Sequence, residues 1–180
     1  MLKISAAFLK EIHRLGEKAY PEEGVGFLFG IDHNNFREVR VIYPVKNARE
    51  KEARHNRYTV TPQDIIRADE SAEEMGLSIV GVFHSHPDHP DEPSAFDLKW
   101  ANTFFSYIIT SVKNGTAITS RSWRLKESRS GFLEEKIVKL KLQSTRSAQR
   151  ATKKGLKTSC QSSKSLRLYA LIQRVKKTSA

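Results

Sequence analysis

Two histidines and an aspartate, His84, His86 and Asp97, are the residues of this chain whose types and spacing indicate chemistry. On an extended strand His84 and His86 point to the same side, because side chains two residues apart share a face. At this spacing both imidazoles can reach one metal ion at about 2.0–2.1 Å. The third ligand must come from elsewhere, and Asp97 is well placed in the first turn of the helix expected to follow. The sequence therefore predicts a His/His/Asp metal site.

The ligand types predict a catalytic metal rather than a structural one. Two histidines and one carboxylate leave the fourth tetrahedral position open to water. These nitrogen and oxygen ligands suit one Zn²⁺ per chain, with iron and manganese as alternatives. Cys160 is the only cysteine, which excludes an intrachain disulfide and a thiolate-rich zinc site. It also argues against a zinc-dependent deaminase, because those enzymes use a His/Cys/Cys ligand set.

Each part of this pattern also has a purely structural interpretation. A lone His-x-His is more often a surface or loop feature. Ser94-x-x-Asp97 matches a capping box, in which the serine caps a helix and the acid reaches back. The cap and the ligand role are compatible, because a cap fixes the first turn that carries Asp97. Asp88 and His89 lie in a proline-rich stretch and are interpreted as rim residues.

The combined spacing is more specific than its parts. His-Ser-His-Pro at 84–87, followed after six residues by Ser94-x-x-Asp97, resembles the signature of the JAMM (MPN-plus) zinc metalloproteases. In that family the signature is paired with an upstream glutamate just before a glycine-containing strand. The segment 21–30 resembles this part, with Glu23 in the position of the family's base. The resemblance covers roughly residues 1–138 and is to the compact bacterial and archaeal type.

The resemblance implies a role for each site residue. His84, His86 and Asp97 would bind the zinc ion. Glu23 would orient and deprotonate the zinc-bound water and pass the proton to the leaving amine, a role worth typically about 10²–10⁴-fold in rate. Ser94 would donate a hydrogen bond to the oxyanion of the tetrahedral intermediate, worth roughly 10²–10³-fold. Without the histidine motif, Glu23 would be interpreted as an exposed acid at a turn.

The resulting hypothesis is a zinc metallopeptidase that hydrolyses a peptide or isopeptide bond. The resemblance alone implies its substrate, the C-terminus of a ubiquitin-like or sulfur-carrier protein. Such a partner ends in a flexible glycine-rich strand that can add to a sheet edge beside the metal. The alternative, from a different class, is a noncatalytic MPN-type interaction module whose basic tail docks on nucleic acid or an acidic partner. The oligomeric state stays open.

The hydrophobic pattern predicts the elements that must position these residues. Caps and helical periodicity predict helices at 5–19, 62–75 and 94–100. Apolar runs and alternation predict strands at 24–30, 37–43, 77–83 and 131–138, and a hairpin of strands 105–112 and 116–125 around Asn114-Gly115. Residues 48–57 are expected to be a loop, and residues 86–93 are too rich in proline for a helix or a ladder. This order agrees with the fold that the resemblance implies, an α/β class with a mixed, curved sheet flanked by helices.

Charge divides the chain into two parts. Residues 1–135 hold 18 Lys and Arg and all 20 Asp and Glu, whereas residues 136–180 hold 13 Lys and Arg and no acid. We therefore expect a JAMM/MPN-like domain at 1–138 and a basic Ser/Thr/Lys-rich tail at 139–180, which its composition predicts to be disordered. Nucleic-acid binding by the tail through counterion release and a shifted reading frame are the alternatives.

The overall composition predicts a protein of the reducing cytoplasm. At 180 residues the chain is long enough to bury one core. No apolar run approaches the roughly 18 residues of a membrane span. Charged residues interrupt the apolar positions after the N-terminus, which is not typical of a signal peptide.

Overall fold

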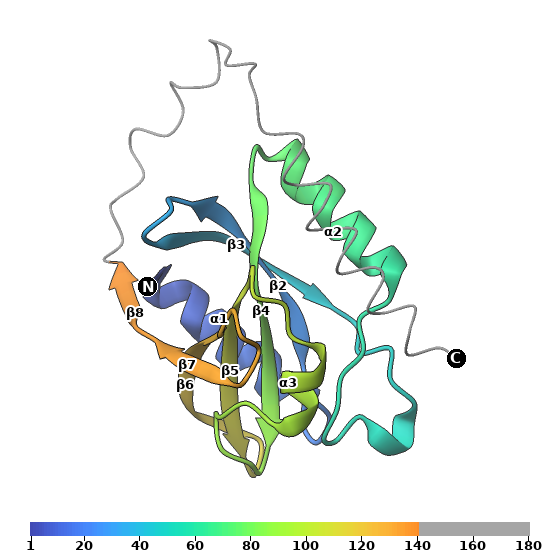
Figure 1. Ribbon diagram of the computed structural model, residues 1–180. Helices are drawn as coiled ribbons and strands as arrows, with labels where there is room; N and C mark the ends of the chain where they lie inside the picture. The colour runs from blue at the N-terminus through green and yellow to red at the C-terminus, as the bar shows by residue number, and fades with distance from the viewer. Residues whose placement is uncertain (141–180) are drawn as a thin grey trace.

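The computed structural model describes residues 1–140, which build one eight-stranded β-sheet with helices packed on it (Figure 1). In chain order the elements are β1 (Leu2–Ser5), α1 (Ala6–Ala19), β2 (Val25–Asp32), β3 (Arg37–Val45), the 3₁₀ helix η1 (Lys51–Ala53), α2 (Pro62–Glu74), β4 (Ser78–Pro87), α3 (Ala95–Trp100), β5 (Ser106–Lys113), β6 (Thr116–Leu125), β7 (Phe132–Glu135) and β8 (Ile137–Leu140).

The sheet is mixed, with the strand order β7-β6-β5-β4-β2-β3-β1-β8. Strand β2 pairs antiparallel with β3 and β4, and β6 pairs antiparallel with β5 and β7. Strand β4 pairs parallel with β5, and β1 pairs parallel with β3 and β8. Parallel neighbours need a crossover connection, and between β4 and β5 this connection contains α3. The α/β class with a mixed sheet flanked by helices is thus confirmed.

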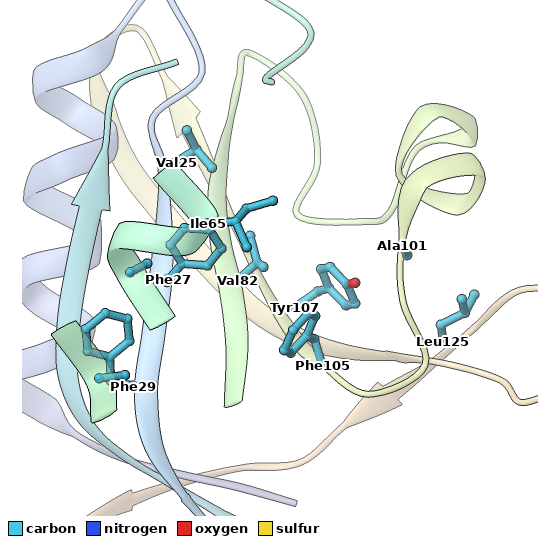
Figure 2. Close-up of a cluster of buried hydrophobic side chains, with 11 residues drawn as sticks. Val25, Phe27, Phe29, Ile65, Val82, Ala101, Phe105, Tyr107 and Leu125 are labelled. Carbon is cyan, nitrogen blue, oxygen red and sulfur yellow. The ribbon is translucent and has the colours of Figure 1, made fainter. Parts of the chain in front are cut away.

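Two hydrophobic cores lie on the two faces of the sheet. The α2-side core, drawn in Figure 2, consists of Val25, Phe27, Phe29, Ile65, Ala68, Ala72, Val82, Ala101, Phe105, Tyr107 and Leu125. The α1-side core consists of Leu2, Ile4, Leu9, Ile12, Leu28, Val39, Val80, Phe83 and Ile108. Each large apolar side chain that is fully buried contributes about 1.5–3 kcal/mol of stability, so both helices are held by the sheet face that they cover.

Alternation along β4 decides which face each site residue meets. Val82 belongs to the α2-side core and Phe83 to the α1-side core. Because strand side chains point alternately to opposite faces, His84 and His86 lie on the α2 side. Ser85 lies on the α1 side. The shared face expected for the two histidines is therefore present.

Strand β4 is longer than the sequence predicts. Residues 86–93 were expected outside any ladder, but His86 and Pro87 pair with β5. The main-chain N–H of Asp88 points to β5, where it donates to the carbonyl of Val112 at 2.7 Å. The nitrogen of Pro87 consequently faces the other side, where β4 no longer pairs with β2. The proline removes no ladder hydrogen bond there, and the strand continues past the position where the prediction ended it.

Other elements differ from prediction where their partners are distant in sequence. Strand β1 was not expected; its four residues are held between β3 and β8. The single strand expected at 131–138 is two strands, β7 and β8, and the loop at 48–57 contains η1. The expected basic tail lies outside the described residues, apart from residues 139 and 140, which belong to β8.

Helix ends follow the local signals closely. The Ser5 hydroxyl accepts the Phe8 N–H at the start of α1. Thr61 and Asp64 form a capping box on α2, with a proline at the first helical turn. No helix in residues 1–140 combines the length and the apolar character that crossing a bilayer requires.

Candidate metal centre

Three predicted ligands converge in the interior on the α2 side of β4. His84 and His86 project from β4, and Asp97 projects from the first turn of α3; all three are buried. The Nε2 atoms of the two histidines are 3.1 Å apart. The Asp97 Oδ1 lies 3.3 Å from His84 Nε2, and its Oδ2 lies 3.7 Å from His86 Nε2. One potential ligand atom from each residue therefore faces a common point.

The tautomer of His86 and the protonation states of His84 and Asp97 fit a metal ion, whereas the pKa of His86, which burial lowers, is raised overall by Asp97 and Glu23. The Nδ1 of His86 donates to the Pro90 carbonyl at 2.8 Å, which favours the tautomer that leaves Nε2 free for a ligand bond. Burial lowers the pKa of His84, although Asp97 opposes the shift, so this ring is neutral at ordinary pH. Burial alone would raise the pKa of Asp97, but His84, His86 and Ser94 hold it well below its usual range. A neutral imidazole and an ionised carboxylate are the forms that bind metal.

Tyr58 contacts the His84 ring, a role that no pattern in the sequence predicts. The two rings are in tilted contact, with 4.7 Å between centroids and 36° between their planes. The Nδ1 of His84 is buried and has no hydrogen-bond partner within residues 1–140. The ring is therefore oriented by aromatic contact, whereas a carbonyl orients His86. Burial, with Asp97 and other neighbours adding to it, holds the pKa of the Tyr58 hydroxyl well above its usual value, so the phenol stays neutral.

Asp97 belongs both to the capping box of α3, whose N-cap is Ser94, and to the site, as the two interpretations of the sequence allowed. Its Oδ2 accepts the Ser94 N–H at 2.7 Å and the Ser94 hydroxyl at 2.6 Å. The Ser94 Oγ in turn accepts the Asp97 N–H at 3.1 Å. This capping box fixes the carboxylate so that Oδ1 faces His84. The role of Ser94 as an oxyanion donor stays a prediction, because its hydroxyl proton is bonded to Asp97 here.

Of the two adjacent acids at the turn before β2, Glu23 is the buried one, with 5% of its surface exposed. Burial raises the pKa of Glu23 to about 8; His86 opposes this shift and Asp97 adds to it. Glu23 is thus coupled electrostatically to two of the three converging residues. Glu22 is half-buried and forms an ion pair with Arg54 at 3.6 Å. A carboxyl poised near neutral pH is suited to accept and return a proton.

Ser85, between the two histidines, has a role that the sequence did not reveal. Its hydroxyl accepts the Gly24 N–H at 2.8 Å, and its N–H donates to the Gly24 carbonyl at 2.9 Å. Because it lies on the α1 side of β4, it contributes no ligand. It fixes the turn that follows Glu23 against the strand that carries the histidines.

The rim residues are anchored rather than ligating. The Asp88 carboxylate accepts the Tyr20 hydroxyl and the Asn114 N–H, both at 2.9 Å. The carbonyl of His89 accepts the Ser111 hydroxyl at 2.6 Å. Neither side chain belongs to the converging His/His/Asp group. These bonds hold the loop whose Pro90 carbonyl orients His86.

Comparison with known proteins identifies related chains. Residues 5–126 match the family described as prokaryotic homologs of the JAB domain. A relative from Thermus thermophilus, named "Probable TtuB-protein conjugate cleaving protease", is 30% identical over 109 residues, covering 61% of this chain and 69% of the relative. A relative from Pyrococcus furiosus, named "Desampylase", is 36% identical over 77 residues, covering 43% of this chain and 50% of the relative.

Two solved structures share the fold. A protein from Salinibacter ruber superimposes with a TM-score of 0.62 and 41% identity, covering 77% of this chain and 91% of that one. A protein from Desulfitobacterium hafniense superimposes with a TM-score of 0.70 and 26% identity, covering 81% of this chain and 97% of that one. The family match spans the turn that carries Glu23, all of β4 and α3. The resemblance to the JAMM (MPN-plus) proteins is therefore confirmed, and this chain belongs to the family of prokaryotic homologs of the JAB domain.

Proposed function

We propose that this chain is a zinc-dependent isopeptidase or peptidase that cleaves at the C-terminus of a ubiquitin-like or sulfur-carrier protein. The observation that carries the proposal is the buried convergence of His84, His86 and Asp97 beside a buried Glu23 whose pKa is raised. The substrate class is supported by the relatives named as a TtuB-protein conjugate cleaving protease and a desampylase.

The side chains have complementary tasks in this reaction. His84 and His86 would hold the ion together with Asp97. When bound, zinc would supply Lewis acidity, polarising the scissile carbonyl and lowering the pKa of water from about 15.7 toward about 7. The Glu23 carboxylate would take a proton from the attacking water and deliver it to the leaving amine. The Ser94 hydroxyl would turn from Asp97 to the oxygen on which negative charge develops.

The raised pKa of Glu23 supports its part in this scheme. A general base must be strong enough to accept a proton, and the resulting acid must be weak enough to persist until the amine leaves. In the metal-free site burial raises the pKa of this carboxyl to about 8, so it binds a proton more strongly than an exposed glutamate does. Glu22, one residue earlier, is half-buried and paired with Arg54.

The test is a comparison of Glu23→Gln with Glu22→Gln. The substrate is a ubiquitin-like carrier joined through its C-terminal glycine to a reporter protein, and zinc is measured in each purified protein. We expect about one zinc per chain in all three proteins. We expect cleavage to fall by about 10²–10⁴-fold in Glu23→Gln and to stay near the wild-type rate in Glu22→Gln.

Two results would overturn the proposal. Full zinc-dependent cleavage by Glu23→Gln would show that this carboxyl is not the base. Failure of the wild-type protein to bind stoichiometric zinc would instead favour the noncatalytic interaction module.

A further inference from the structure

We propose that Asn47, which lies in the connection between β3 and η1, is a positioning residue for Glu23. The inference rests on the proposed function, because it assigns Asn47 a part in placing the general base. Asn47 is buried, with 8% of its surface exposed, and belongs to no motif in the sequence. Its side chain joins the Glu23 main chain to the loop that carries Tyr58.

The side-chain amide of Asn47 is fully used. Its Nδ2 donates to the Glu23 carbonyl at 3.3 Å and to the Arg57 carbonyl at 3.0 Å. Its Oδ1 accepts the N–H of Arg49 at 3.0 Å and of Thr59 at 3.1 Å. A primary amide offers two donor hydrogens and one oxygen with two lone pairs, so each has a partner. A buried amide with its complete set of bonds rigidly fixes the groups that it joins.

Hydrogen bonds fix the main chain of Glu23 and of the residue that follows it. Its carbonyl accepts from Asn47, and its N–H donates to the Arg54 carbonyl at 2.7 Å. The next residue, Gly24, is bonded to Ser85 of β4 through both its N–H and its carbonyl. Two of these attachments come from the loop after β3 and two come from the strand of the histidines. The Cα of Glu23, from which the carboxyl extends, is thereby placed relative to the metal ligands.

The same loop orients a metal ligand. Asn47 closes the loop by accepting the Thr59 N–H, and the N–H of Ala48 donates to the Thr59 carbonyl at 2.9 Å. Tyr58 lies between Arg57 and Thr59, both bonded to Asn47, and its ring contacts the His84 ring. Asn47 therefore connects this loop to the base, Glu23, and lies next to the loop residue that contacts the ligand His84. A displacement of about 1 Å at such a point can cost about 10²-fold in rate.

Asn47→Asp tests whether the bond from Asn47 to the Glu23 carbonyl matters apart from the bonds that the Asn47 oxygen makes within its own loop. Aspartate keeps the oxygen that accepts from Arg49 and Thr59 but replaces the amide that donates to Glu23 and Arg57. Asn47→Ala removes all four bonds and introduces no buried charge, so it serves where the aspartate variant does not fold. The matched control is Asn102→Asp, because Asn102 is also buried, with 4% exposed. Its Oδ1 accepts the Phe104 N–H in a different loop.

Four quantities are measured for each variant: bound zinc, the kcat and the KM for the carrier substrate, and hydrogen exchange at the Glu23 amide. For Asn47→Asp and Asn47→Ala we expect stoichiometric zinc, a kcat lowered by about 10²-fold and an unchanged KM. We expect the Glu23 amide to exchange faster relative to amides of β5. Asn102→Asp should lose stability with kcat and relative Glu23 exchange unchanged.

The exchange measurement keeps this inference separate from the proposed function. If the wild-type protein cleaves nothing, the proposed function fails, and Glu23 exchange alone decides whether Asn47 holds that residue. Unchanged relative exchange in both Asn47 variants would overturn the inference. An equal fall in kcat in Asn102→Asp would also overturn the inference. So would a fall in kcat that follows loss of zinc, because Asn47 would in either case only stabilise the fold.

Discussion

The two buried carboxyl groups at this centre have pKa values shifted in opposite directions. Asp97 stays ionised despite its burial, because His84, His86 and Ser94 hold its pKa well below the usual range. Glu23, also buried, has a pKa raised to about 8. The pKa values of two buried carboxyls in one site are thus driven apart, that of Glu23 upward by burial and that of Asp97 downward by its histidine and serine partners, which is a pattern typical of acid–base sites.

The raised pKa of Glu23 predicts a pH-dependent stability of the metal-free protein. The folded state holds this proton up to about pH 8, whereas an ordinary glutamate releases it near 4.5. Between these values the folded state binds more protons, so the free energy of unfolding falls as pH rises. The contribution approaches roughly 1.4 kcal/mol per pH unit. Glu23→Gln should remove it, and the comparison is made by denaturant unfolding from pH 5 to pH 8.

The difference between wild type and Glu23→Gln reports this carboxyl together with its electrostatic coupling to His86. Glu22→Gln is the control and should keep the wild-type slope. A Glu23→Gln slope equal to that of the wild type would contradict the prediction.

At the scale of elements, the sequence predicts those features that depend on hydrogen bonds between residues close together in the chain. The starts of α1, α2 and α3 were found because their caps lie within four residues. Strand β1 and the end of β4 were missed because distant strands pair with them. The same distinction holds in the site. His84, His86 and Asp97 follow from spacing, whereas Tyr58, Ser85 and Asn47 act through contacts with segments remote in sequence.

The capping box of α3 predicts that Ser94 supports metal binding through the helix. Ser94→Ala removes the hydroxyl that caps α3 and holds Asp97 Oδ2. We expect the metal-free protein to lose about 1 kcal/mol of stability. We expect zinc affinity to fall by about 10–100-fold, measured by competition with a chromogenic chelator. Ser94→Thr restores a hydroxyl and should recover most of both losses. Wild-type affinity in Ser94→Ala would show that the cap does not orient Asp97.

At the scale of the molecule, the centre joins segments that are far apart in the chain. Glu23 precedes β2, the histidines lie on β4, and Asp97 lies in the crossover to β5. These segments meet only when the middle of the sheet has formed. A ligand that binds the three residues together therefore binds the folded state and stabilises it.

Zinc should accordingly raise the melting temperature. Free zinc at 100 times its Kd adds about 2.7 kcal/mol to the free energy of unfolding. Asp97→Asn should lose most of this shift, measured by calorimetry with and without the metal. Asp88→Asn is the matched control, since Asp88 lies on the rim outside the converging group. An equal loss of the shift in both variants would contradict the assignment of Asp97 as a ligand.

Strand β8 forms one edge of the sheet, and β1, β3 and β2 separate it from β4. Neighbouring strands lie about 4.8 Å apart, so four steps place the end of β8 roughly 19 Å from β4 across the sheet. The strand registers place the end of β8 level with the region of Ile79 on β4, so a fluorophore attached at that end would lie farther than this from His84, five residues along the strand. Energy transfer from such a dye to a coloured metal ion such as Co²⁺ would then report occupancy of the centre without touching any residue that builds it.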